Sequence, residues 1–184
     1  MRLRSGTAVP TSWCIPLDSK KISLRQTVLF GMLGALTFAA KVAMAGLPNI
    51  EPVSLFVMLF AVTFGRKCIY PIYTYVVLEW LFYGLSLYSI PYAYIWSILA
   101  FAAWCLRDMK NPLAWALLSG FFGLAFGFLC AILYLFFGGI PVVITTWIAG
   151  IFYDILHCAG NFVIALILFV PLRKLLQQLY ARIT

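Results

Sequence analysis

The sequence predicts an all-α membrane protein built as a bundle of six transmembrane helices. Hydrophobic residues make up 65% of the chain and charged residues only 10%, and the mean hydropathy is +1.03. A soluble domain carries about 25% charged residues and has no place to bury this much apolar surface. Several stretches of about 20 residues are almost free of charge, the length that crosses a hydrocarbon core ~30 Å thick. An ordinary soluble globule is therefore excluded.

Residues 1–22 differ from the rest of the chain, and we expect them to form a mobile cytosolic tail. They combine basic residues with Asp18 and two prolines and contain no apolar run. Because a signal peptide needs an apolar stretch of about 7–15 residues, none is predicted here. The transmembrane domain is expected to cover 23–184, and Ser23 followed by Gln26 fits a capping box at the start of its first helix.

Six spans are expected within this domain. They are predicted at 26–46, 52–64, 69–88, 91–106, 112–137 and 141–171. Four prolines stand at predicted helix starts, where the missing N–H costs nothing: Pro52, Pro91, Pro112 and Pro141. The five cysteines have no paired spacing, so each is expected to behave as a small apolar residue.

The distribution of basic residues predicts the orientation. Of the 13 Lys and Arg residues, all except Lys41 lie on one side of the membrane: before the first span, in two connections, and after the sixth span. The connections on the other side contain neither residue type. Because Lys and Arg accumulate in cytoplasmic loops, both termini are predicted to be cytoplasmic, in a multi-pass protein of the cell (plasma) membrane. The net charge of +8 is thereby explained without nucleic acid as a partner.

Two spans have unusual lengths. The second, at 52–64, has only about 13 residues, too few to cross a bilayer. The segment before it is then expected to lie below the outer surface, where protein or a water-filled cavity must cover its backbone. We interpret this as an outward-facing cavity with Asn49 and Glu51 on its wall; a thin local bilayer or a tilted neighbouring helix is the alternative. The sixth span is too long and is expected to divide at Gly150, with 142–149 folded over the cavity mouth.

Polar residues within the spans suggest a binding site. Asp154, His157 and Asn161 share one helix face, and a charge at a helix centre costs ~2.5–3.5 kcal/mol, so this face should point inward. The three residues either line a ligand site, which we favour, or form a structural network. Glu79 lies midway through the third span. Lys41 either extends to the outer interface or pairs with an acidic residue inside.

Aromatic residues crowd the outer halves of the third, fourth and sixth spans, among them Tyr83, Trp96 and Trp147. They form either an interfacial belt or part of a pocket for a planar ligand. In the first span Gly31, Ala35 and Ala39 recur every four residues. Such small-residue stripes let helices approach closely, either within a bundle or against a detachable partner helix.

The six-span plan, this stripe, the 47–52 segment and the Asp154–Asn161 run together resemble the substrate-binding S component of energy-coupling factor (ECF) vitamin transporters. The resemblance covers about residues 22–180. It implies that the chain captures a vitamin-like small molecule in an outward pocket and releases it inside after docking on a membrane coupling subunit, which two cytosolic ATPases energise. Gly31, Ala35 and Ala39 would then be the docking face. The chain has no GxxxxGK[ST] phosphate loop, so ATP chemistry is expected from the partners.

The expected substrate-binding residues suit a ring-bearing, hydrogen-bonding ligand such as cobalamin, riboflavin or a thiamin precursor. They are Asn49, Glu51, Glu79, Tyr83, Trp96, Trp147, Asp154, His157 and Asn161. Neither a cofactor nor a metal is expected, and no enzymatic activity. A structural or assembly membrane protein without substrate is the main alternative. A rhomboid-like protease is disfavoured because Ser119-Gly120 lacks the preceding glycine of a GxSx motif and lies near the predicted cytoplasmic end.

Overall fold

The computed structural model describes residues 22–46 and 50–182, and these residues form helices and the connections between them. The helices are α1 (Leu24–Ala43), α2 (Val53–Phe64), α3 (Ile69–Tyr83), α4 (Tyr92–Cys105), α5 (Pro112–Ala131) and α6 (Leu135–Ala181), with two short 3₁₀ helices, η1 (Gly65–Cys68) and η2 (Ile132–Tyr134). By length and composition, three helical stretches can cross a membrane: Leu24–Ala43, Val53–Tyr83 and Pro112–Ala181. The all-α membrane class is as predicted. The number of spans and their orientation stay predictions, and the expected tail lies outside the described residues except for Ile22.

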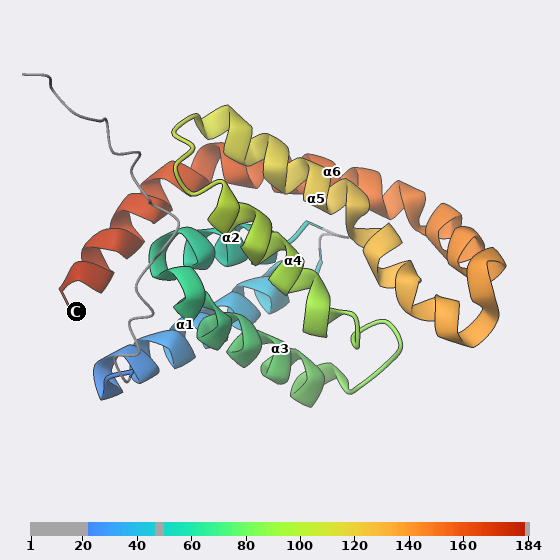
Figure 1. Cartoon of the computed structure of the whole chain (residues 1–184), viewed down its shortest axis with the longest axis horizontal. Coiled ribbons are helices and arrows are strands. Elements are labelled where there is room, and N and C mark those ends of the chain that lie inside the picture. The colour runs from blue at the N-terminus through green and yellow to red at the C-terminus, as the bar shows by residue number, and fades with distance from the viewer. Residues whose placement is uncertain (1–21, 47–49, 183–184) are drawn as a thin grey trace, which may run out of the picture.

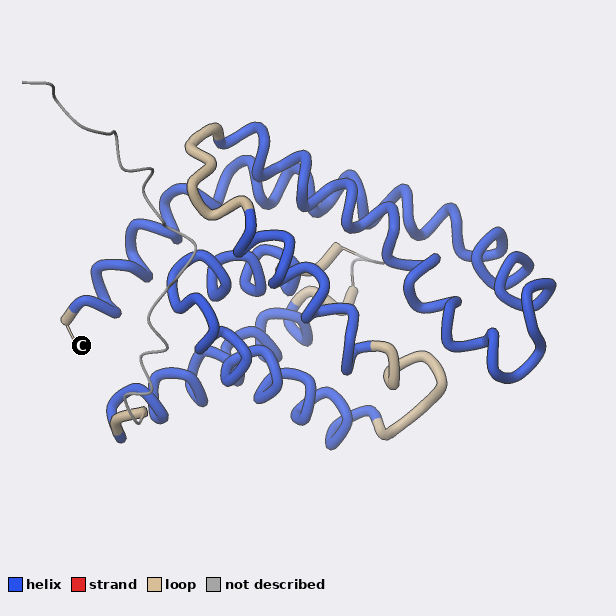
Figure 2. Tube along the Cα trace, viewed as in Figure 1, coloured by secondary structure: helices blue, strands red, loops and turns tan. Residues whose placement is uncertain are grey.

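The helices are arranged around a central pair. In Figure 1, α1 and α3 pack together, α5 and α6 form a long antiparallel pair, and α2 and α4 lie between these two groups. Figure 2 shows loops at the connections from α3 to α4 and from α4 to α5. This arrangement gives α2 neighbours on several sides.

The short helix α2 forms the core of the fold. Nine of its 12 residues are buried, and it contacts α1, α4 and α6. A helix enclosed by other helices does not face lipid along its length, so the requirement for about 20 apolar residues does not apply to it. Just before α2, Ile50 packs against α6, where a Cβ placed on Gly160 would lie 3.1 Å from its side chain. Protein therefore covers the end of the connection that leads into α2.

The first helix begins as the sequence predicts. Ser23 Oγ accepts a hydrogen bond from the Gln26 backbone N–H at 3.2 Å, and Gln26 Oε1 accepts one from the Ser23 N–H at 3.3 Å, which completes the capping box. The buried face of α1 includes Phe30, Gly34 and Thr37. A Cβ placed on Gly34 would lie 2.6 Å from the Thr74 Cβ, so glycine permits the close contact between α1 and α3.

Glycines also let α5 and α6 approach closely. A Cβ placed on Gly123 would lie 2.8 Å from the carbonyl carbon of His157, and one on Gly127 would lie 2.4 Å from Asp154 Oδ2. In lipid, where hydrophobic burial does not drive helices together, such backbone proximity supplies the packing energy.

The predicted turn between the last two spans is confirmed, but the predicted division at Gly150 is wrong. The helical backbone of α5 continues through η2 into the first residues of α6 and is interrupted at Gly139, after which α6 continues through Gly150 without a break and ends at Ala181 rather than at 171. The non-helical backbone lies at Gly139, with φ 67°, where the chain reverses. Glycine tolerates this left-handed conformation, whereas a glycine inside a helix costs only about 1 kcal/mol relative to alanine. In Figure 1 the hairpin of α5 and α6 extends past the ends of α3 and α4. None of the residues 142–149 belongs to the lining of the polar cavity described below.

The close contact at Gly34 leads to a test in which two glycines of one helix are compared. We expect Gly34→Ala to lower the free energy of unfolding by about 1–3 kcal/mol, because the added methyl overlaps Thr74 and the Pro71 carbonyl oxygen. Gly31→Ala is the matched control, since its Cβ meets nothing within 4 Å. Thermal unfolding of both variants in detergent measures the difference, and equal stability would contradict the α1–α3 packing.

Candidate functional site

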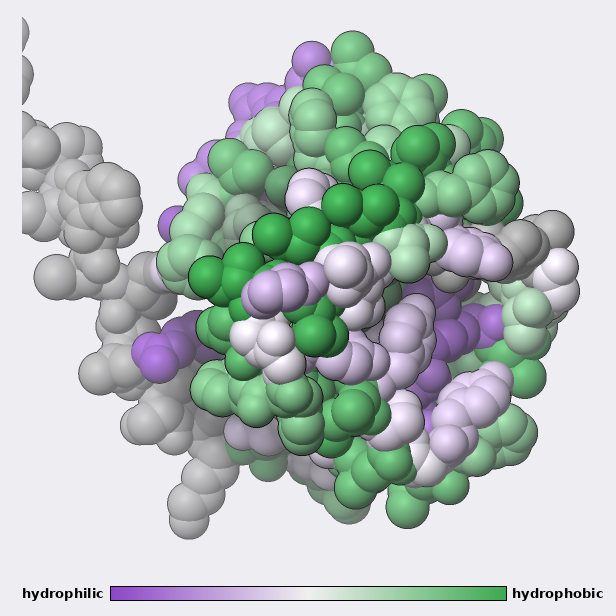
Figure 3. All heavy atoms as spheres, turned by 90° about the vertical axis from the view of Figure 1, so that its right-hand side faces the viewer, coloured by the Kyte–Doolittle hydropathy of each residue, from purple (hydrophilic) through white to green (hydrophobic). Residues whose placement is uncertain are grey.

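A polar cavity of about 400 Å³ opens at the end of the molecule that carries the connection from α3 to α4. Its lining comes from the end of α1 and the turn after it, the segment before α2, the end of α3, the connection from α3 to α4 and the first residue of α4. The lining residues are Lys41, Met44, Ala45, Ile50, Glu51, Glu79, Tyr83, Ser86, Tyr88, Ser89 and Tyr92. Figure 3 looks at this end and shows hydrophilic atoms gathered in a hollow among more apolar ones. The volume falls within the range of small-molecule sites.

Lys41 lies among the acidic groups of the cavity. Its Nζ donates a hydrogen bond to Glu79 Oε1 and lies 3.6 Å from Glu51 Oε2. The side chains of Lys41, Glu51 and Glu79 are 16%, 15% and 6% exposed. The question that the sequence left open is thus answered: Lys41 pairs inside the protein with two carboxylates rather than extending to the outer interface.

Tyrosine rings surround the same ammonium group. Lys41 Nζ lies 5.1 Å from the ring centroid of Tyr92 and 5.9 Å from that of Tyr83. The Tyr88 ring packs edge-on against Tyr92 at 6.1 Å. A cation within about 6 Å of an aromatic centroid is attracted by the ring quadrupole. The cavity therefore combines carboxylates with ring faces, both of which favour positive charge.

The carboxylates of the cavity are incompletely compensated. Glu79 is buried, and its Oε2 has no hydrogen-bond partner among the described residues. In the connection before α2, burial raises the pKa of the Glu51 carboxyl, and the nearby Lys41 opposes this shift. In the connection between α3 and α4, burial raises the pKa of the Tyr88 phenol to about 12. Tyr88 is therefore a neutral hydrogen-bonding group at ordinary pH.

Hydrogen bonds hold the connection between α3 and α4 over the cavity. α3 ends at Tyr83, earlier than predicted, because Gly84 adopts φ 81°. Ser89 Oγ then donates to the Gly84 carbonyl oxygen at 3.2 Å and accepts from the Ser86 N–H at 2.9 Å. The indole of Trp80 donates to the Ser89 carbonyl oxygen at 2.9 Å. These bonds bring both serines and Tyr88 to the cavity wall.

The three polar residues of α6 lie deeper than the cavity. Asp154, His157 and Asn161 are each 2% exposed or less, as the predicted inward face requires, but none of them lines the cavity. The His157 ring packs edge-on against Phe126 at 4.8 Å, and Phe126 packs against Tyr92 at 6.0 Å. Phe126 thus lies between His157 and the cavity wall.

The partners of these α6 residues differ. Asn161 Nδ2 donates to Ser54 Oγ at 3.0 Å and to the Ser119 carbonyl oxygen at 3.3 Å, so it links α6 to α2 and α5. Asp154 Oδ1 accepts a hydrogen bond from the Gly127 N–H at 2.9 Å. Among the described residues, neither Asp154 Oδ2 nor either ring nitrogen of His157 has a partner. Asn161 therefore has a structural role, while the ligand roles expected of the α6 residues stay predictions.

The predicted aromatic and loop residues fall in different places. Trp96 is fully buried and packs edge-on against Tyr92 at 5.6 Å, so it supports the cavity wall from behind. Trp147 packs against Phe128 at 5.3 Å and does not line the polar cavity. Asn49 lies outside the described residues. Glu51, Glu79 and Tyr83 are the predicted residues that line the cavity.

Several cavity residues were not predicted as site residues, namely Lys41, Ser86, Tyr88, Ser89 and Tyr92. Gly84 followed by Ser86 and Ser89 is a turn signal that shortens the third span. A shorter span moves Tyr88 out of the helix and toward the mouth of the cavity.

Within 22–46 and 50–182, no group of three His, Cys, Asp or Glu side chains is placed to hold a metal ion.

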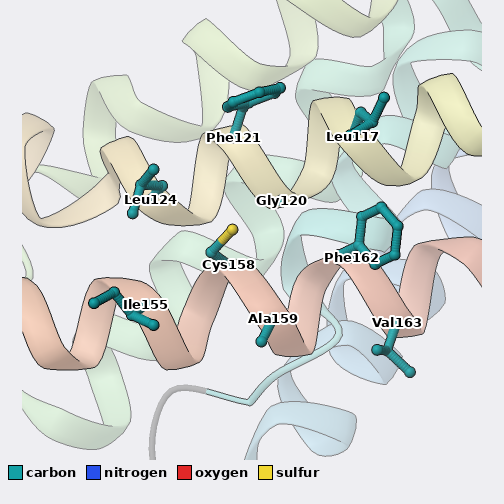
Figure 4. A pocket seen from close by; sticks show the side chains of 9 residues that line it. All are labelled: Leu117, Gly120, Phe121, Leu124, Ile155, Cys158, Ala159, Phe162 and Val163. Atoms are coloured by element: carbon teal, nitrogen blue, oxygen red, sulfur yellow. The ribbon is translucent and has the colours of Figure 1, made fainter.

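A second concavity, of about 430 Å³, lies between α5 and α6. Figure 4 shows its lining, in which Leu117, Phe121 and Leu124 come from α5 and Ile155, Cys158 and Phe162 from α6. The side chains are apolar apart from the Cys158 thiol, so they supply no strong hydrogen-bonding group to orient a polar ligand. The polar cavity is therefore the better candidate site.

The fold and the site define an all-α membrane protein with a polar, tyrosine-lined cavity at one end. Comparison of the chain with protein-family models, with curated proteins and with solved structures gave no match. The function must therefore be argued from the cavity and the helix surfaces.

The ion pair between Lys41 and Glu79 predicts that substitutions of these two residues affect the free energy of unfolding in a strongly coupled way. We expect Lys41→Met alone to destabilise the protein by about 3 kcal/mol or more, because it leaves two buried carboxylates uncompensated. The double variant Lys41→Met/Glu79→Gln should be more stable than the sum of the single effects predicts. Measuring the free energy of unfolding of the parent, of Lys41→Met, of Glu79→Gln and of the double variant tests this pairing. Additive effects of the two substitutions would contradict it.

Proposed function

We propose that the protein is the substrate-capture subunit of an ECF-type micronutrient uptake transporter in the cell membrane. The observation that carries this proposal is the polar cavity, which is open at one end and combines Lys41, Glu51 and Glu79 with three tyrosines. A mostly apolar chain keeps such charged groups inside only where they pair or serve a function. A cavity of this size with a few placed polar groups is typical of a small-molecule site.

The arrangement of the basic residues supports a cavity that faces outward. At the end of α1 away from Lys41, Gln26 Nε2 donates to the Tyr180 hydroxyl at 3.3 Å, and Tyr180 packs on Phe64 beside η1. Arg173 donates to the Arg107 carbonyl oxygen at 3.1 Å. Basic residues of η1, the α4–α5 connection and the end of α6 thus surround the end of the bundle remote from the cavity. Because basic residues favour the cytoplasmic side, the cavity is assigned to the outer side, with both termini inside.

The small-residue face of α1 supports docking on a partner. Ala35 and Ala39 are exposed, and a Cβ on Gly31 would meet nothing within 4 Å. By contrast Gly34, on the adjacent face, is in close contact with α3. The stripe at 31, 35 and 39 is therefore not used for packing within this chain, and it leaves space for close approach of another helix. In our proposal this helix belongs to a membrane coupling subunit driven by two cytosolic ATPases.

The alternatives fit these observations less well. A structural or assembly protein without substrate accounts for the exposed stripe but gives no reason for buried charges around an open cavity. A rhomboid-like protease gains no support from Ser119, which is 1% exposed and whose Oγ has no partner among the described residues. A serine nucleophile needs a base within hydrogen-bond reach. We therefore propose no catalytic role.

The decisive experiment separates ligand capture from docking. The full-length chain, purified in detergent, is titrated with cobalamin, riboflavin and thiamin precursors, and the ligand that binds is then used in uptake assays in cells. We expect Ala35→Trp and Ala39→Trp to abolish uptake and to leave the affinity within about twofold of the parent, because the added ring blocks only the partner surface.

Val77→Trp is the matched control for this prediction. Val77 is 48% exposed on α3 and lies outside the stripe, so the same substitution there should preserve both uptake and binding. Loss of binding in the α1 variants would contradict docking on this face. A chain that binds none of the compounds would contradict capture and favour the structural alternative.

A further inference from the structure

The charges of the polar cavity do not balance. One ammonium, that of Lys41, faces two carboxylates, those of Glu51 and Glu79. Lys41 binds only one oxygen of Glu79; the other, Oε2, is buried in the cavity wall without a partner among the described residues. Buried carboxylate oxygens ordinarily accept hydrogen bonds. The cavity thus has an unused acceptor and, when both carboxylates are ionised, one surplus negative charge.

The other described Lys and Arg residues are not placed to supply the missing positive charge. They lie in the first turn of α1, in η1, in the α4–α5 connection and at the end of α6. These segments gather at the opposite end of the bundle, as the contacts of Tyr180 with Gln26 and Phe64 show. When both carboxylates are ionised, the cation that completes the cavity therefore comes from outside the described residues.

The tyrosines also favour a positive charge in the cavity. Lys41 Nζ already lies near the ring faces of Tyr83 and Tyr92, so a positive charge in this cavity is attracted by aromatic groups as well as by carboxylates. An anionic ligand would compete with both glutamates for one ammonium and would leave Glu79 Oε2 unpaired. A neutral ligand would leave the surplus charge in place.

We infer that the captured substrate is a ring-bearing organic cation whose positively charged N–H group binds between Glu79 Oε2 and Glu51, while its ring packs against Tyr88 and Tyr92. This inference rests on the proposed role in substrate capture and names the substrate class. Lys41 stays on Glu79 Oε1, so the occupied cavity holds two positive and two negative groups and is neutral. The 3.6 Å separation between Lys41 and Glu51 leaves that carboxylate able to turn toward the ligand.

Three probes of one shape test the charge of the ligand. Tryptamine is a cation at neutral pH, tryptophol is its neutral counterpart, and indole-3-propionate is an anion with the same ring. Isothermal titration of the purified full-length chain should give tryptamine a dissociation constant about tenfold or more below that of tryptophol, because hydrogen bonds to charged groups are the stronger ones. Indole-3-propionate should bind most weakly.

Two variants assign this preference to the cavity. Glu79→Gln and Glu51→Gln should each bring the dissociation constant of tryptamine to within about threefold of that of tryptophol. Glu51 provides the second test if Glu79→Gln fails to fold. Asp108→Asn is the control, because it makes the same change in net charge at an exposed position in the α4–α5 connection, and it should leave the preference unchanged.

The outcomes separate this inference from the proposed function. Equal or tighter binding of tryptophol or indole-3-propionate would overturn the cationic substrate but leave small-molecule capture standing. Absence of binding by all three probes would also overturn it, and the vitamin titration then decides about capture. A preference for tryptamine that survives in both glutamate variants would place the cation elsewhere and overturn the assignment.

Discussion

The ion pairs of Lys41 with Glu79 and Glu51 are the interaction on which the arrangement of the cavity end of the bundle depends. They join α1, the segment before α2, and α3 in a chain whose exterior is largely apolar. In such surroundings a single unpaired charge is costly, so each of these three segments is held where its charged group meets the others. The same groups prevent apolar side chains from filling the space beside them. The cluster of Lys41, Glu51 and Glu79 therefore both joins these segments and keeps the cavity open beside them.

Close backbone packing supports this cluster from both sides. Gly34 brings α1 against α3, while Gly123 and Gly127 bring α5 against α6. The enclosed helix α2 fills the space between these pairs, and Asn161 fixes it through Ser54. The stripe at Gly31, Ala35 and Ala39 lies on the adjacent face, where Ala35 and Ala39 are exposed and a Cβ on Gly31 would meet nothing within 4 Å. One helix thus uses small residues on two faces, the first for packing within the chain and the second, in our proposal, for a partner.

The sequence predicted the features that depend on composition and on local contacts. Apolar content identified an all-α membrane protein, and Ser23 with Gln26 identified the start of α1. The inward direction of Asp154, His157 and Asn161 followed from their spacing and from the cost of exposing them to lipid. Pairing of Lys41 with an acidic residue was weighed, but its partners depend on which helices become neighbours, and a single sequence does not give this.

Other features depended on details that a sequence does not distinguish. Gly139 and Gly150 are both glycines in an apolar run, and the sequence predicted a break at each. Only Gly139, next to Gly138 and just before Pro141, leaves the helix. Trp147 and Tyr92 are both aromatic residues of the predicted outer halves of their spans, but one packs on Phe128 and the other lines the cavity. The depth of the α6 residues behind Phe126 is likewise a matter of tertiary packing.

The proposed capture of a micronutrient is tested most directly by an experimental structure of the chain at a saturating concentration of the compound that titration identifies, determined by cryo-electron microscopy or crystallography. Our account predicts that the ligand lies in the polar cavity, within hydrogen-bond distance of Glu79 Oε2 and against the rings of Tyr88 and Tyr92. A ligand found instead in the apolar groove between α5 and α6, or a polar cavity left empty at saturating ligand, would contradict it.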